Sequence, residues 1–358
     1  MKFLAINFGG LGDEVLFLPT LKSVKRAHPD WEITLLTEPR SKAIMQLSSL
    51  IDKNIVFDIK KTPLLPADYF ELIALLRAGK YDIVLSSGSS SKVCLLLLAS
   101  GIAKRIGYDS GGLSRLLLTS AVPLNKEQYA GDMYHDLVKG LNIDLPSEPP
   151  AVDLDQQALS KMAEFLKQER AKQSRAAGRL VLIHPGMSQM ALKKGIIKTW
   201  SAENWAALSK KLLGLNHAVI LCGGPDDEVT IGDITASLGS NPDAEAGLFI
   251  NAFGKTASIK DLAALMQLAD LIVCVDSAPM HIAAALQKRL VALFGPTDPK
   301  KLLLESEKAI AIAENKSEPM PAGGEPSVRI QQDTVYQIVL DQLNRASAQG
   351  NSLEFHRN

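Results

Sequence analysis

"DLIVCVDSAPMHIAAALQKRLVALFGPTDP", residues 270–299, places a helix-length segment between two apolar runs of strand length. The first run ends at Val275, and the next two residues, Asp276 and Ser277, favour a helix N-cap. Pro279 suits the first turn of that helix. A strand, a helix and a second buried strand in this order predict a parallel sheet of an α/β protein.

The same alternation continues along the whole chain. Near-continuous apolar strands separated by helix-length segments are typical of parallel sheets covered on both faces. Two blocks of similar size therefore predict two Rossmann-like domains whose sheets face each other across a cleft, with ligands at the carboxyl ends of the strands. The strand-length runs are 2–8, 32–37, 54–59, 81–87 and 104–108 in the first block, and 179–186, 217–224, 247–254, 270–277 and 289–296 in the second.

The expected domain boundaries follow from the amino-acid composition of the segment between the two blocks. Residues 142–155 contain three prolines and scattered acids, a composition typical of an interdomain linker. We therefore expect an N-terminal domain over 1–150, a linker and connecting helix over 151–177, and a C-terminal domain over 178–330. An amphipathic pattern predicts a last helix over 331–346, and the polar residues 347–358 are expected to form a flexible tail.

Composition excludes several classes of protein. Lys plus Arg and Asp plus Glu both number 39, so there is none of the basic excess of a nucleic-acid-binding protein. The longest apolar block, 93–103, is too short for a bilayer, and the N-terminus does not resemble a signal peptide. Cys94, Cys222 and Cys274 lie far apart in apolar runs, as buried reduced thiols do. These features predict a soluble cytoplasmic protein without a metal cluster.

Several predicted strand ends carry groups that suit a nucleotide. The helix beginning after Ser277 would present free N–H groups to an anion, and His281 would add a donor one turn later. An ordinary helix cap would explain the same residues, but the turn "FGPTDP" should lie at the same sheet edge. Loop 186–198 adds a glycine, a serine and lysines that suit a diphosphate, although a solvated basic loop is an equal interpretation. In "LCGGPDDEV", residues 221–229, a carboxylate could bind ribose hydroxyls or could simply lie in a surface turn.

The first block has one comparable turn, "INFGGLGDEV" at 6–15. It has neither the G-x-G-x-x-G pattern nor the Lys-Ser/Thr of a phosphate-binding loop. Asp13 falls in the first helical turn, where the dipole favours its ionised form, so it is placed to act as a general base. The alternative is an acid that only complements the helix dipole, which is the sole role we can argue for Glu14.

Together these stretches resemble glycosyltransferase family 9, the ADP-heptose:lipopolysaccharide heptosyltransferase family. The resemblance extends to about residue 345, and the turn at 6–15 and the stretch 270–299 carry most of it. It implies a GT-B fold, with a glycolipid or glycan acceptor on the N-terminal domain and a nucleotide-sugar, ADP-heptose in the family, on the C-terminal domain. It also implies inverting transfer without a metal or other cofactor, in the cytoplasm and compatible with peripheral contact at the inner membrane surface.

The resemblance further implies roles for individual residues. Asp13 corresponds to the catalytic base, and the acceptor loop contains Gly9, Gly10 and Gly12. Lys193 or Lys194 could replace Lys198, because the loop is longer than in the family, and Asp227 could replace Glu228 as the ribose-binding acid. Ala278 stands where the family has glycine. The residues implied in donor binding are Gly186, Ser188, Lys198, Glu228, Asp276, Ser277, Ala278, His281 and Thr297.

Three other functions compete with this interpretation. A sugar-nucleotide epimerase has the same architecture but requires other acid/base carboxylates. A catalytically inactive family member with a scaffolding role is favoured by Ala278 and the long loop, and disfavoured by the presence of Asp13 and His281. An NAD-dependent dehydrogenase is disfavoured by the missing G-x-G-x-x-G pattern.

Overall fold

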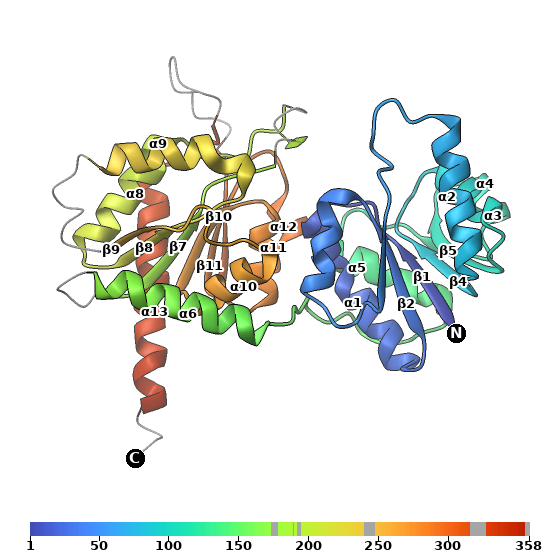
Figure 1. Cartoon of the computed structure of the whole chain (residues 1–358), viewed down its shortest axis with the longest axis horizontal. Coiled ribbons are helices and arrows are strands. Elements are labelled where there is room, and N and C mark those ends of the chain that lie inside the picture. Colours follow the sequence, from blue (N-terminus) through green and yellow to red (C-terminus); the bar gives the residue numbers. More distant parts are fainter. Residues whose placement is uncertain (173–177, 189, 192–194, 240–247, 316–326, 355–358) are drawn as a thin grey trace. The chain divides into compact units, whose positions relative to one another are not determined.

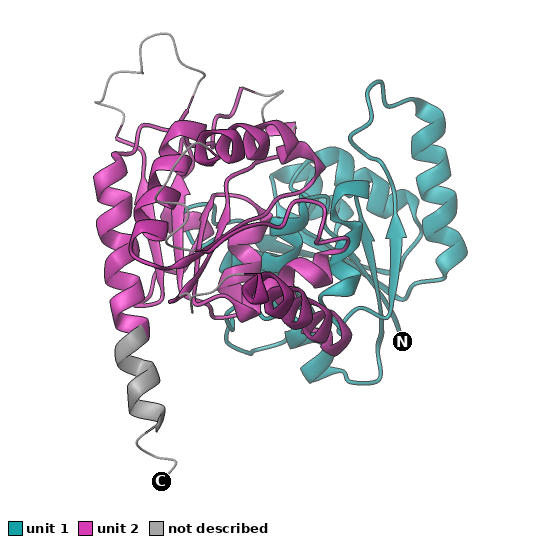
Figure 2. Cartoon of the chain, turned by 60° about the vertical axis from the view of Figure 1, so that its left-hand side comes forward, with its two compact units in different colours: residues 1–153 teal, residues 154–358 magenta. Residues whose placement is uncertain are grey.

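The computed structural model describes residues 1–172, 178–188, 190–191, 195–239, 248–315 and 327–354, with side chains up to residue 346. The chain divides into two compact units, Met1–Asp153 and Leu154–Asn358 (Figure 2). No helix in the described ranges is long and apolar enough to cross a membrane. Cys94, Cys222 and Cys274 are buried and unpaired, as expected.

Unit 1 is built around a six-stranded parallel sheet with the order β3-β2-β1-β4-β5-β6 (Figure 1). The strands are β1 (Lys2–Ile6), β2 (Glu32–Thr37), β3 (Lys53–Val56), β4 (Ile83–Ser86), β5 (Lys104–Asp109) and β6 (Ser120–Pro123). The helices are α1 (Leu11–Ala27), α2 (Pro66–Gly79), α3 (Ser91–Ala99), α4 (Gly112–Leu117) and α5 (Ala130–His135), with 3-10 segments η1 (Pro39–Gln46) and η2 (Asp136–Leu141).

Unit 2 repeats this topology with the order β12-β11-β10-β7-β8-β9. The strands are β7 (Leu180–His184), β8 (Ala218–Leu221), β9 (Leu248–Asn251), β10 (Leu271–Val275), β11 (Leu290–Phe294) and β12 (Ala309–Ala313). The helices are α6 (Gln156–Ala171), α8 (Ala202–Gly214), α9 (Glu228–Leu238), α10 (Ile259–Leu268), α11 (Ala278–Ala285), α12 (Pro299–Leu302) and α13 (Gln332–Glu354), with η3 (Pro225–Asp227).

Both sheets reverse their strand order beside the first strand of the unit. In unit 1 the reversal lies between β1 and β4, where Ile6 is paired with Ser86. In unit 2 it lies between β7 and β10, where His184 is paired with Cys274. Ligands of doubly wound sheets bind outside the carboxyl ends of the strands at this switch point. The turns that follow β1, β7 and β10 therefore stand where such folds place their ligands.

The predicted fold class is confirmed, and the ten expected strands are all present. β1 and β7 are buried on both faces, which explains why their sequences are continuously apolar rather than alternating. Each sheet also has a sixth strand, β6 or β12, that the sequence pattern did not single out. The last helix continues to Glu354, beyond residue 346 where we expected it to end.

Candidate active site

The glycine-rich turn of unit 1 holds Asp13 in a fixed position. Gly10 is the N-cap of α1 and has no side chain that could accept from the first helical N–H groups. The carboxylate of Asp13, three residues later, reaches back, and its Oδ2 accepts a hydrogen bond from the Gly10 N–H at 2.8 Å. A Cβ atom on Gly9 would lie 2.2 Å from the Cβ of Asp13. Only glycine at this position lets the chain pass so close to the side chain.

The second carboxylate oxygen of Asp13 has a different partner. Its Oδ1 accepts a hydrogen bond from the Tyr134 hydroxyl at 3.2 Å. Burial, reinforced by the charge of Asp13, raises the pKa of Tyr134 well above its usual value, so the hydroxyl stays protonated and donates. Tyr134 lies in α5, 121 residues from Asp13, in a stretch without a recognisable motif, which is why sequence reasoning missed it.

Glu14, for which the sequence suggested no role beyond complementing the helix dipole, is buried. Its exposed fraction is 1%, because one residue of helix rotates the side chain from the turn into the core of unit 1. Neither carboxyl oxygen has a hydrogen-bond partner among the described residues. Burial, followed by the negative charge of Asp13, raises the pKa of Glu14 well above its usual value.

Replacing Glu14 with glutamine is expected to stabilise the protein more at pH 8 than at pH 5. A carboxyl group with a raised folded-state pKa contributes stability that is present below its unfolded pKa and is lost as pH rises through the folded pKa. Glutamine cannot ionise, so the Glu14→Gln variant should gain at least about 1 kcal/mol over wild type between these pH values, since one pKa unit corresponds to about 1.4 kcal/mol. Urea unfolding at both pH values measures the difference. Glu71→Gln, an exposed substitution in α2, is the matched control; a pH-independent gain for Glu14→Gln would contradict this account.

Unit 2 brings three predicted donor-binding residues together from separate segments. Asp276 follows β10 and is almost completely buried. Its Oδ2 accepts hydrogen bonds from the Lys198 ammonium and from the Thr297 hydroxyl, both at 2.6 Å. The carboxylate therefore holds one cationic and one hydroxyl group beside the start of α11.

The backbone on both sides of Lys198 is held by contacts with other segments of unit 2. A Cβ atom on Gly295 would lie 2.5 Å from the carbonyl oxygen of Ile197, so the turn after β11 and this segment are in close contact. The indole N–H of buried Trp200 donates to the carbonyl oxygen of Ile330 at 3.0 Å. Lys198 therefore stands on a fixed backbone, whereas Lys193 and Lys194, the alternatives left by the sequence, lie outside the described residues.

The start of α11 is suited to an anion. Ser277 is its N-cap, but the serine side chain makes no capping hydrogen bond, so the N–H groups of the first turn are not satisfied by it. Asp276 does not cap the helix, contrary to our expectation, because its carboxylate is engaged by Lys198 and Thr297. Ala278 lies in the first turn without a positive φ, so its methyl group introduces no backbone strain. His281 is buried one turn further along.

The two candidate acids in the turn after β8, Asp227 and Glu228, differ in burial. Asp227 is almost fully buried, and its Oδ2 accepts from the Gly224 N–H at 2.8 Å. A Cβ atom on Gly186 would lie only 1.6 Å from Asp227 Oδ1, so a residue with a side chain at position 186 would collide with the carboxylate. Burial raises the pKa of Asp227 to about 6. Glu228 is exposed at the beginning of α9, so its carboxylate is accessible from solvent, whereas that of Asp227 is not.

The remaining donor candidate, Ser188, is exposed, and its hydroxyl accepts from the Ala191 N–H at 3.4 Å. Across the described ranges, no three His, Cys, Asp or Glu side chains are grouped as metal ligands.

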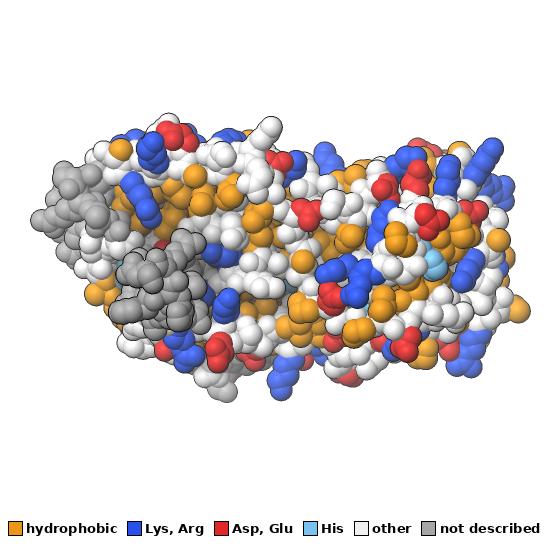
Figure 3. Space-filling model, turned by 90° about the horizontal axis from the view of Figure 1, so that it is seen from below, with side chains coloured by type: hydrophobic (Ala, Val, Ile, Leu, Met, Phe, Trp, Pro, Cys, Tyr) orange, Lys and Arg blue, Asp and Glu red, His pale blue; other side chains and the backbone are white. Residues whose placement is uncertain are grey.

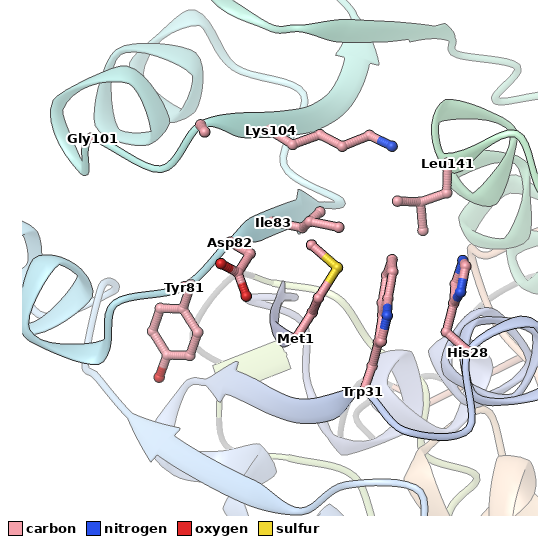
Figure 4. A pocket seen from close by; sticks show the side chains of 10 residues that line it. Met1, His28, Trp31, Tyr81, Asp82, Ile83, Gly101, Lys104 and Leu141 are labelled. Atoms are coloured by element: carbon pink, nitrogen blue, oxygen red, sulfur yellow. The ribbon is translucent and has the colours of Figure 1, made fainter.

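A cavity of about 640 Å³ lies away from these residues, at the amino ends of β1, β4 and β5 (Figure 4). Its lining includes Trp31, Asp82 and Lys104, and it is at the edge of the sheet opposite to Asp13.

Comparison with known proteins gives the chain a family. The model of "Glycosyltransferase family 9 (heptosyltransferase)" matches residues 69–328, more than half of the chain. Lipopolysaccharide heptosyltransferase 3 of Escherichia coli is 28% identical over 297 residues, covering 80% of this chain and 81% of that protein. The protein named Photosynthetic NDH subunit of subcomplex B 1, chloroplastic, from Arabidopsis thaliana is 24% identical over 326 residues, covering 86% of this chain and 66% of that protein.

Solved structures agree on the fold. The structure of E. coli ADP-heptose lps heptosyltransferase II has a TM-score of 0.74 at 23% identity, covering 98% of this chain and 100% of that one. Two Rossmann-like units of this kind make up the GT-B fold, which confirms the predicted architecture. The family match includes the segments that carry Lys198, Asp276 and Thr297. The chain belongs to glycosyltransferase family 9.

Proposed function

We propose that this glycosyltransferase transfers a heptose from ADP-heptose to a hydroxyl group of a lipopolysaccharide-core or related envelope glycan. The observation that carries the proposal is the Lys198–Asp276–Thr297 cluster beside the start of α11, which suits a nucleotide diphosphate. The names of the relatives supply the sugar and the acceptor: one is a lipopolysaccharide heptosyltransferase, and another is an ADP-heptose lps heptosyltransferase.

On the donor side, unit 2 would stabilise the leaving group. Negative charge develops on the diphosphate as the bond to the sugar breaks, and preorganised positive groups lower the energy of that transition state. Lys198 and the first N–H groups of α11 supply this charge, with Glu228 available for the ribose. Because these groups are the protein's own, we propose that transfer needs neither a metal ion nor another cofactor.

On the acceptor side, unit 1 would supply the base. The acceptor oxygen attacks the anomeric carbon from the face opposite to the diphosphate, a carbon–oxygen bond forms as the bond to the diphosphate breaks, and ADP leaves. The acceptor proton passes to the carboxylate of Asp13. A single displacement of this kind inverts the anomeric centre. Tyr134 holds Oδ1 of Asp13, so it would act as a positioning residue for the base.

The proposal is tested by donor binding and by product formation. ADP-heptose should raise the melting temperature of the full chain above the effects of UDP- and GDP-sugars, since a ligand at 100 times its Kd stabilises by about 2.7 kcal/mol. Mass spectrometry should then detect a heptose added to a purified lipopolysaccharide-core acceptor, with inverted configuration by NMR and undiminished yield in EDTA. Stabilisation by another nucleotide-sugar, with that sugar transferred, would overturn the heptose assignment.

A second candidate function is favoured by one observation. The Arabidopsis relative has a name that describes a subunit of a larger complex rather than a transferase. A family member that binds a nucleotide-sugar without transferring it would show the same shift in melting temperature as a transferase. It would give no product with any acceptor, so the two assays together distinguish the two functions.

A further inference from the structure

The exposed hydrophobic side chains of the protein are concentrated on one group of helices. Of the twelve large hydrophobic side chains that are exposed among the described residues, seven lie between residues 65 and 116. α3 packs against both α2 and α4, and the three helices lie together in unit 1 (Figures 1 and 2). We call these residues the α2–α4 surface: Leu65, Phe70, Leu75, Leu95, Leu98, Leu113 and Leu116.

α3 is apolar on its outer face as well as on its inner one. Leu96 and Leu97 are buried, yet Leu95 and Leu98 on the outside are 50% and 44% exposed. A helix at the surface of a water-soluble unit normally carries polar side chains outward, and a helix that is hydrophobic all round is buried in protein or lipid. α3 has one charged residue, Lys92, in its first turn. Its outer face therefore needs a partner.

The charges around this surface indicate what that partner is. Residues 61–119 contain seven Lys and Arg but four Asp and Glu, whereas the whole chain is balanced at 39 of each. α3 and α4 each carry one basic residue, Lys92 and Arg115, and no acidic residue. Figure 3 shows hydrophobic side chains together with Lys, Arg, Asp and Glu side chains at its right-hand end, which is part of unit 1. Apolar side chains flanked by basic ones suit the interface of a bilayer with anionic headgroups.

The position of α3 links this surface to the proposed base. α3 follows the carboxyl end of β4, which lies next to β1. The Ser87 N–H donates to the carbonyl oxygen of Ile6 at 3.0 Å, and the Ser87 hydroxyl donates to the Asn7 side chain at 2.8 Å. The α2–α4 surface thus begins at the sheet edge that carries Asp13. An acceptor held by its lipid in a bilayer could present a sugar to this edge.

We propose that the α2–α4 surface binds the anionic phospholipid surface of a membrane, with Leu95 and Leu98 entering the headgroup region and Lys92 at the phosphates. The reason for such binding rests on the proposed function, because a lipid-linked acceptor is found at a membrane. The binding itself requires no activity and is measured separately.

The experiment compares the full chain with variants in a vesicle co-sedimentation assay. Wild type should bind vesicles of phosphatidylethanolamine and phosphatidylglycerol and lose affinity as salt is raised. Leu95→Ser with Leu98→Ser should weaken binding at least about tenfold. Lys92→Glu, an exposed charge reversal that spares the fold, should weaken it at least about fivefold at low salt. The matched control is Leu215→Ser with Leu304→Ser, because these side chains are 49% and 44% exposed elsewhere in the chain.

The outcomes separate the membrane surface from the proposed function. The serine variant should keep the wild-type rate with a delipidated, water-soluble acceptor and lose rate with the same acceptor in vesicles. If the protein bound vesicles but transferred sugar to neither acceptor, the proposed function would be overturned and the proposed membrane-binding surface would be retained. Equal binding by wild type and the serine variant would overturn the surface, and so would an equal loss in the control. A wild-type dimer that the serine variant dissociates would identify a protein interface instead and would also overturn the proposal.

Discussion

Replacing Asp13 with asparagine is expected to lower kcat for sugar transfer about 100- to 10,000-fold, the range that general-base catalysis contributes. Asparagine keeps an oxygen that can accept from the Gly10 N–H, so the cap of α1 is retained while the basic group is lost. Donor binding, which we assign to unit 2, should be unchanged. Steady-state kinetics with lipopolysaccharide-core acceptor and calorimetry with ADP measure the two effects.

A matched control separates basicity from capping. Asp68 has the same position in α2, where its Oδ2 accepts from the Leu65 N–H at 2.7 Å, and it lies in the same unit. Asp68→Asn should keep wild-type kcat. Tyr134→Phe removes the donor to Asp13 Oδ1 and should have a smaller effect than Asp13→Asn, together with a shifted pH profile of kcat/KM. Wild-type activity in Asp13→Asn would remove Asp13 from the reaction.

Replacing Lys198 with alanine is expected to lower kcat about 100- to 1,000-fold, the usual loss when one preorganised group is removed from a developing negative charge. The substitution also leaves the buried carboxylate of Asp276 without its cation. ADP should bind more weakly, because the diphosphate loses the same contact. Kinetics with saturating acceptor and ADP calorimetry measure both losses.

The chain offers a control for the cost of breaking this ion pair. Lys161 pairs at 2.9 Å with Asp261, a buried aspartate of unit 2 at the start of α10. Lys161→Ala should therefore lower stability by a similar mechanism while leaving kcat and ADP affinity at wild-type values. If Lys161→Ala and Lys198→Ala impaired transfer equally, the effect would be one of folding, and the diphosphate would have to be assigned to other residues.

Local patterns in the sequence predict most of the strands and helix starts of this structure. Continuous apolar runs of strand length predicted ten strands in two parallel sheets, because a strand covered on both faces has no polar positions. β6 and β12 were not singled out, because β6 has four residues and ends in a proline and β12 has alanine at every second position. The position of a glycine-rich turn before Asp13, and of a helix start after Ser277, is also local, since caps depend on residues a few positions apart.

The chemistry of each group was decided by contacts distant in sequence. Lys198 and Asp276 are 78 residues apart, and their ion pair forms only once the chain has folded. Burial raises the pKa values of Glu14 and Asp227, and the sequence around them does not show that they are buried. The sequence by itself determined which strand ends carry polar groups. Tertiary structure alone decided which of them are buried, paired or open to a ligand, because desolvation and pairing depend on every segment packed around a side chain.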